Sequence, residues 1–190
     1  MADDLTILRN VGETLQTLLK ENIAVLDEVL FESPADMTVP TGNKGNLSLF
    51  LYQVMENIHL RNRNLEARGP ERLGHSPVIL DLHYLATPYA KNREGEFDLL
   101  EKVVRTFYDH ATLRGSVLKG MLLDSGNEEL RVEPHYLSLE ELNHLWSTFT
   151  KPLKPSIAYI VTPVRIPSTR ELGTQRVVHK EDRYHQIVGK

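Results

Sequence analysis

The residues best suited to chemistry are the eight histidines and one aspartate–histidine pair. Asp81 and His83 are two positions apart in a segment that alternates like a β-strand, so both side chains should lie on one face and could form a carboxylate–imidazole pair. No serine or other nucleophile is marked out to use that pair, so a structural role is favoured over a hydrolase. The histidines show neither the H-E-x-x-H motif nor helical i, i+4 spacing, and His179 and His185 lie in a polar tail. The sequence therefore nominates no metal, no other cofactor and no catalytic group.

The segment TGNKGN, residues 41–46, places glycines around a lysine, as phosphate-binding loops do. It lacks the G-x-x-x-x-G-K-[ST] spacing, and no helix is expected directly after it. We therefore predict a plain loop.

A polar, cationic segment, NIHLRNRN (residues 57–64), follows one of the most hydrophobic predicted strands. Arginine suits bidentate contacts with carboxylates or phosphates, so a catalytic loop, a nucleic-acid clamp and a subunit contact are all conceivable. The net charge of −4 and the scarcity of interleaved aromatic residues disfavour nucleic acid. A solvated loop shaped by its asparagines remains the alternative to a subunit contact.

Composition limits the class of protein. With 190 residues the chain suits one core rather than two domains, and it has no cysteine for disulfides or thiolate chemistry. The first residues, MADDLTILRN, are acidic where a secretory signal would be basic and then apolar. No apolar run approaches the roughly 20 residues that span a bilayer. We expect a cytoplasmic chain with no direct membrane insertion.

Apolar spacing predicts three amphipathic helices. The first, over residues 4–22, has an apolar stripe of Leu8, Val11, Leu15 and Leu18. The second, over residues 95–111, should bury Phe97, Leu100, Val103, Val104 and Phe107. The third opens at a capping box, Ser138 with Glu141, and its apolar side comprises Leu139, Leu142, Leu145, Trp146 and Phe149.

Strands are predicted at residues 29–31, from Leu47 onward, and over residues 78–87, 129–134 and 156–166. The strand at Leu47 is apolar on both faces, which is typical of a sheet covered on both sides. Pro163 indicates that the last strand lies at an edge or is bent there. The predicted fold is a single α/β domain with a central mixed sheet flanked by about three helices.

After Ile166 the helical and strand patterns fade, and we divide the chain into a domain, residues 1–166, and an extended basic arm, residues 167–190. From Arg165 onward six basic residues accompany three acidic ones, a charge of +3, which leaves −7 for the rest. Such an arm suits contact with another subunit, and a frayed terminus is the alternative. The arm residues assigned to this contact are Arg170, Arg176, Val177, Val178, Lys180 and Arg183.

Five stretches together resemble a known family: LFLYQVMENIHLRN, PVILDLHYLATPYA, LLEKVVRTFYDHATLRGSVL, LSLEELNHLWSTF and PSIAYIVTPVRI. They occur in the order, and at roughly the intervals, seen in the tail-terminator (cap) proteins of extracellular contractile injection systems, which are phage-tail-like particles. The resemblance covers about residues 5–166. It implies an α/β domain, six copies of which form a homo-hexameric ring at the distal end of inner tube and sheath. The chain differs from longer members in stopping at residue 190, which leaves open a sole cap or an adaptor beneath a second cap protein.

The resemblance implies a structural protein rather than an enzyme, with itself, the sheath and the inner-tube subunits as partners and no nucleic acid. Its motif includes Glu56, Asn57, Arg61 and Asn62, which we take with the adjacent Arg63 as an interface element. The implied location is the cytoplasm, followed by assembly into a particle that is either released or membrane-associated. Another tail-completion or head–tail joining protein is the near alternative, and a hydrolase using Asp81 and His83 is the distant one.

Overall fold

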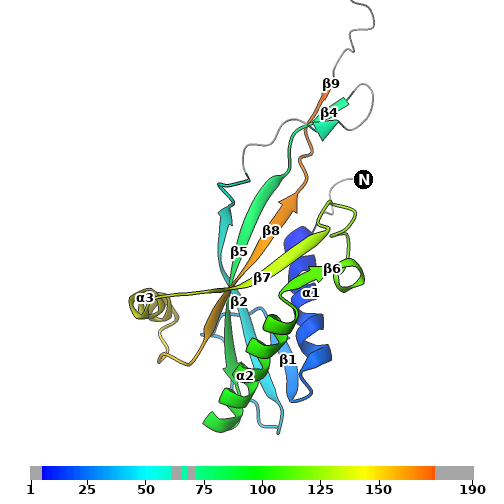
Figure 1. The fold of residues 1–190 in the computed structure, drawn as a ribbon. Helices are drawn as coiled ribbons and strands as arrows, with labels where there is room; N and C mark the ends of the chain where they lie inside the picture. Colours follow the sequence, from blue (N-terminus) through cyan, green and yellow to red (C-terminus); the bar gives the residue numbers. More distant parts are fainter. Residues whose placement is uncertain (1–5, 61–65, 68–71, 174–190) are drawn as a thin grey trace, which may run out of the picture.

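The computed structural model describes residues 6–60, 66–67 and 72–173. Their centre is a six-stranded sheet in the order β1-β2-β5-β8-β7-β6, in which β1 and β2 are parallel and all other neighbours are antiparallel (Figure 1). Its strands are β1 (Leu26–Leu30), β2 (Gly45–Glu56), β5 (Val78–Tyr89), β6 (Thr112–Arg114), β7 (Glu129–His135) and β8 (Ile157–Ile166). The α-helices of the described residues are α1 (Ile7–Asn22), α2 (Arg93–Asp109) and α3 (Leu139–Phe149). The predicted single α/β domain with a mixed sheet and three helices is confirmed.

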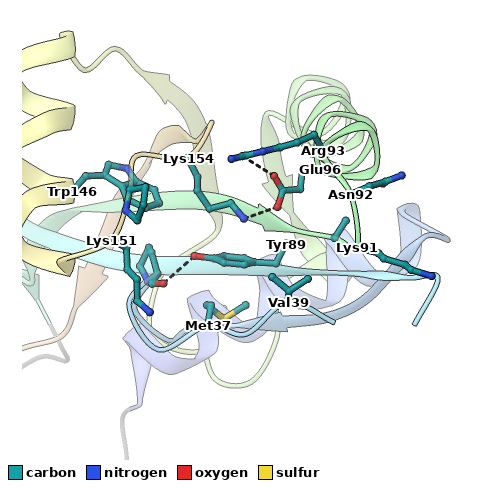
Figure 2. A pocket seen from close by; sticks show the side chains of 13 residues that line it. Met37, Val39, Tyr89, Lys91, Asn92, Arg93, Glu96, Trp146, Lys151 and Lys154 are labelled. Carbon is teal, nitrogen blue, oxygen red and sulfur yellow. Dashed lines mark hydrogen bonds and ion pairs between the residues drawn. The ribbon is translucent and has the colours of Figure 1, made fainter. Parts of the chain in front are cut away.

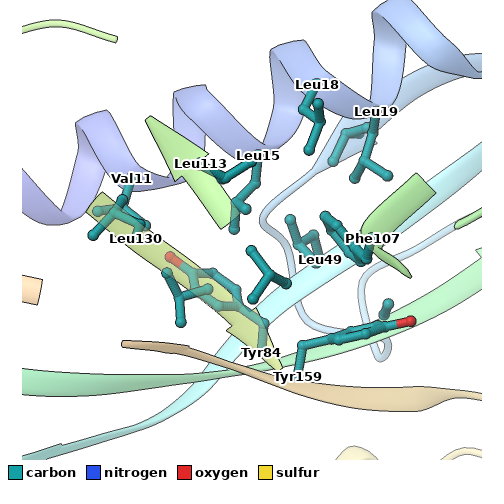
Figure 3. Close-up of a cluster of buried hydrophobic side chains, with 14 of the residues drawn as sticks. Val11, Leu15, Leu18, Leu19, Leu49, Tyr84, Phe107, Leu113, Leu130 and Tyr159 are labelled. Carbon is teal, nitrogen blue, oxygen red and sulfur yellow. The ribbon is translucent and has the colours of Figure 1, made fainter. Parts of the chain in front are cut away.

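One face of the sheet is covered by α1 and α2, and the main core lies between them and the strands (Figures 1 and 3). Val11, Leu15 and Leu18 of α1 are buried as predicted, whereas Leu8 is exposed. Aromatic contacts join the layers, because Phe107 of α2 packs edge-on against Tyr159 of β8 with ring centroids 4.7 Å apart.

The predicted buried stripe of α2 is wrong in part. Val103 and Phe107 are buried, Leu100 is half-buried, and Phe97 and Val104 are exposed. The helix carries apolar residues on two adjacent stripes, and the sheet covers only one of them. An exposed apolar stripe therefore remains on α2.

The opposite face of the sheet is covered by α3 (Figure 1). The predicted capping box is confirmed, since the Ser138 hydroxyl accepts from the backbone N–H of Glu141 and the Glu141 carboxylate accepts from the backbone N–H of Ser138. Trp146 and Phe149 fix the helix to the sheet, whereas Leu139, expected on the same apolar side, is 67% exposed. Leu139 lies in the first turn, and its neighbours Leu137 and Leu142 pack against the cluster instead.

Pro163 does not lie at an edge, because β8 is paired with β5 on one side and with β7 on the other. The alternative prediction, that the strand is bent at Pro163, is the one observed. Leu80 of β5 pairs with Val164 and Leu82 pairs with Val161, so Asp81 alone faces two residues of β8. Proline has no N–H to donate, and this β-bulge places it where no ladder hydrogen bond is needed.

A second sheet, in the order β3-β4-β9, adjoins the end of the main sheet where β5 begins and β8 finishes (Figure 1). Its strands are β3 (Glu66–Ala67), β4 (Arg72–Gly74) and β9 (Glu171–Gly173). β9 belongs to the predicted basic arm, of which residues 174–190 lie outside the described residues. The division of the chain at Ile166 therefore stays a prediction.

Candidate interaction surface

Most of the outer edge of β2 has no other described strand beside it. β1 pairs with β2 only as far as Ser48, and beyond that point β2 is bonded to β5 alone within the part of the chain that the structure describes. Val54 and Met55, near the end of the strand, are 44% and 48% exposed. An unpaired strand edge offers backbone donors and acceptors to another chain. We call residues 49–55 the free edge.

The turn after the free edge is built around Asn57. Its side-chain Oδ1 accepts from the backbone N–H groups of His59 and Leu60, both at 3.1 Å, and its Nδ2 donates to Asp81 Oδ1 at 3.0 Å. The hydroxyl of Thr162, in the β8 bulge, donates to the same carboxylate oxygen. Asn57 thus ties the turn to two strands of the sheet, while His59 is exposed.

Replacing Asn57 with alanine should lower the free energy of unfolding by about 1–3 kcal/mol, because two turn N–H groups and the Asp81 carboxylate lose a partner. Urea unfolding of the purified chain measures this effect. The matched control is His59→Ala in the same turn, for which we expect a change within about 0.5 kcal/mol. Equal effects of the two substitutions would show that the side chain of Asn57 does not hold the turn.

A cleft of about 540 Å³ opens between this turn and strands β7 and β8. Its wall carries Glu129. The Glu129 carboxylate accepts a hydrogen bond from Arg131 Nε at 2.8 Å and another from the Arg114 guanidinium of β6. These hydrogen bonds hold the pKa of Glu129 below its ordinary value, and the bond from Arg131 has the largest effect. The alternation of carboxylate and guanidinium groups suits polar contact with a protein surface rather than catalysis.

The Asp81–His83 pair does not form. Asp81 bonds to Asn57 and Thr162, whereas the buried ring of His83 packs edge-on against His135, with centroids 5.0 Å apart, and no hydrogen bond joins Asp81 to His83. Burial and the neighbouring His135 lower the pKa of His83, and the Asp81 carboxylate opposes them. The ring contact joins β5 to β7 across the intervening strand β8.

Because the folded chain binds a proton at His83 less readily than the unfolded chain does, stability should fall as pH drops through about 6.5, the ordinary histidine pKa. Urea midpoints at pH 7.5 and 5.5 would measure the loss, and His83→Phe should flatten the dependence. Glu129 and Glu141 have lowered carboxyl pKa values, so their contribution to stability is lost in a separate pH range, near pH 4 and below. A slope that the His83 substitution leaves unchanged would contradict this assignment.

At the opposite end of the sheet lies a second recess of about 400 Å³, which we call the cationic pocket (Figure 2). Its centre is the buried side chain of Glu96 in α2. The Glu96 carboxylate accepts hydrogen bonds from Arg93 at 3.1 Å and from Lys154 at 2.5 Å. Lys154 also lies 4.1 Å from the ring centroid of Tyr89, whose hydroxyl donates to the backbone carbonyl of Pro34. One carboxylate thus neutralises only part of the positive charge of this pocket.

The TGNKGN segment leads into a strand rather than a helix, because β2 begins at Gly45. A Cβ at Gly45 would lie 2.9 Å from Leu99 and 3.0 Å from the carbonyl oxygen of Tyr89. Glycine therefore allows close packing here. Residues 41–44 form the predicted loop, whereas Gly45 and Asn46 already belong to the strand.

A profile of the Pvc16 N-terminal domain matches residues 10–180 of the chain. The chain belongs to the Pvc16 N-terminal domain family. The resemblance noted from the five sequence stretches is thereby confirmed. No curated protein sequence matches the chain.

Two solved structures share the fold of this family member. One is a cryo-EM structure of an extracellular contractile injection system, the PVC sheath/tube terminator in its extended state, with a TM-score of 0.68, 18% identity, and coverage of 95% of this chain and 64% of that one. The other is the cap of the anti-feeding prophage, a tube-terminating cap, with a TM-score of 0.65, 18% identity, and coverage of 92% and 60%. The chain thus spans about three fifths of the length of these structures.

The predicted interface residues of this chain fall into two groups. Glu56 follows the free edge and is exposed, Asn57 builds the turn, and Arg170 is exposed just before β9. The others lie outside the described residues: Arg61, Asn62, Arg63, Arg176, Val177, Val178, Lys180 and Arg183. Their assignment stays a prediction.

Sequence reasoning missed the cationic pocket and the cleft, because each joins residues distant in the chain. Lys154 and Glu96 are 58 positions apart, and Arg114 and Glu129 are 15 apart. In residues 6–60, 66–67 and 72–173, no cluster of three or more histidine, aspartate or glutamate side chains is suited to a metal. Within those same ranges no helix has the length and hydropathy to cross a bilayer.

Proposed function

We propose that this chain is a structural cap, or tail terminator, of a contractile injection particle. The observation that carries the proposal is the family match over residues 10–180, joined to a fold that the sheath/tube terminator and the tube-terminating cap share over more than nine tenths of the chain. The cap binds the last layer of tube and sheath subunits and presents no equivalent surface for another layer. Polymerisation then stops by differential binding.

The cap acts as a homo-hexameric ring, with or without a second cap protein above it. A closed ring needs heterologous contacts, in which one surface of a subunit fits a different surface of its neighbour. Such a protein requires a rigid core and complementary surfaces, and no catalytic group. We therefore assign a non-enzymatic function, with assembly in the cytoplasm.

The free edge and the turn after it are the proposed contacts with the polymer end. Exposed Val54, Met55 and Ile58 beside an unpaired strand support this role, since extended segments bind sheet edges through backbone hydrogen bonds. Arg61 and Arg63 extend the contact, and Asn57 positions the turn. The basic arm, with Arg176 and Val177, reaches a sheet edge of an adjoining subunit.

Deleting the gene and measuring particle lengths by negative-stain microscopy tests the proposal. We expect tubes and sheaths of uncontrolled length without the chain, and uniform lengths when it is restored. Particles of unchanged length in the deletion strain would overturn the cap function.

A further inference from the structure

Two separate surfaces of the domain have opposite charge, and each includes apolar side chains that the described part of the chain leaves uncovered. One comprises the cationic pocket and the exposed apolar stripe of α2. The other is the outer side of β1 and its flanks, residues 25–32. The two surfaces share no residue, although Pro34, Met37 and Val39, which follow residues 25–32 in the chain, line one wall of the pocket.

The α2 stripe consists of Phe97, Leu100, Val104 and Tyr108, spaced by three and four residues along one side of the helix. Phe97 is 55% exposed and Tyr108 is 83% exposed. Arg93 and Glu96, two turns and one turn before Leu100, line the pocket, so the stripe continues from the rim of the pocket along the helix. An apolar stripe of this length on a helix is unlike the scattered exposed residues of ordinary surfaces.

The pocket adds positive charge to this surface. Four cations line it, Lys91, Arg93, Lys151 and Lys154, against the single carboxylate of Glu96, which leaves +3. Arg93 and Lys154 both pair with Glu96, whereas Lys91 and Lys151 are exposed and form no ion pair with a described residue. The surface therefore suits a partner that combines carboxylates with apolar side chains.

Residues 25–32 have that chemistry. Asp27, Glu28 and Glu32 are exposed, form no ion pair with a described residue, and give the segment a charge of −3. Val25 and Phe31 beside them are also exposed. The backbone of β1 is partly closed to strand addition, because Gln16 of α1 donates to the carbonyl of Val29 at 2.7 Å, so this segment offers side chains for contact.

We infer that residues 25–32 of one copy dock on the cationic pocket and α2 stripe of the next copy, forming the subunit contact of the ring. The inference rests on the proposed cap function and names its partner, a second copy of this chain. The net positive charge of the pocket and the net negative charge of residues 25–32 favour a head-to-tail contact and disfavour a two-fold one, in which each surface would meet itself.

The absence of cysteine in the chain allows a direct test with Glu28→Cys and Lys151→Cys. In particles treated with a short bismaleimide, the variant with both cysteines should give a ladder of cross-linked multimers. Each single-cysteine variant should stay monomeric, and particles that contain both single variants should stop at dimers. Self-dimers of either single variant, or cross-links only to a different protein, would overturn the inference.

Charge reversal provides the second measurement. Glu28→Lys should lower the fraction of capped particles about tenfold or more, and adding Lys151→Glu in the same chain should restore most of it. Loss of capping without rescue would overturn the contact. Capped particles that give no ladder would reject this inference alone, whereas particles that form normally without the chain would reject the cap function itself.

Discussion

Replacing Phe107 with alanine should lower the free energy of unfolding by about 3–5 kcal/mol, one of the largest effects available in this domain. Phe107 is 2% exposed and its ring packs edge-on against Tyr159, so the truncation leaves a cavity between α2 and the sheet and removes an aromatic contact. Urea or thermal unfolding followed by circular dichroism measures the loss.

Phe97→Ala on the same helix is the matched control. Both phenylalanines were expected in the core from sequence, but Phe97 is 55% exposed, so its truncation should change stability by no more than about 0.5–1 kcal/mol. If Phe97→Ala destabilised the purified chain as much as Phe107→Ala, the observed orientation of α2 would be wrong.

Introducing lysine at both Val54 and Met55 should lower the fraction of capped particles about tenfold or more while the chain stays folded. Natural sheets use lysine to block strand addition at exposed edges, and the proposed contact with the polymer end relies on an unblocked edge. Both side chains are exposed, so the free energy of unfolding should change by about 0.5 kcal/mol at most per substitution.

Tyr136→Lys is the control for this experiment, because it also replaces an exposed apolar side chain, in the turn between β7 and α3. We expect it to leave capping unchanged. Normal capping by the Val54 and Met55 double variant would remove the free edge from the proposed contact.

The helices show what hydrophobic periodicity can and cannot predict. It located α2 within two residues of its bounds, but selected a buried side that included Phe97 and Val104 and omitted Leu99. Spacing identifies apolar stripes, and only the packed sheet determines which of two neighbouring stripes is buried. In α3, where Trp146 and Phe149 lie on a single stripe, the prediction failed only at Leu139.

The surfaces were less accessible to sequence analysis. The stretch around Asn57 was recognised as a turn or interface element, but its bonds to Asp81 in β5 and to the backbone of Leu60 depend on the tertiary fold. Pro163 predicted either an edge strand or a bend, and only the observed strand order, with β8 inside the sheet, excludes the edge. The cationic pocket gave no local signal, because Glu96 and Lys154 become partners only after folding.

The most direct test of the central claim is cryo-electron microscopy of the distal end of intact particles, compared with particles from cells that lack this chain. The account predicts a ring of density into which the domain fits, seated on the last tube and sheath layer, absent in the deletion, with tubes of uncontrolled length. A particle end of normal length and unchanged density in the deletion would contradict it.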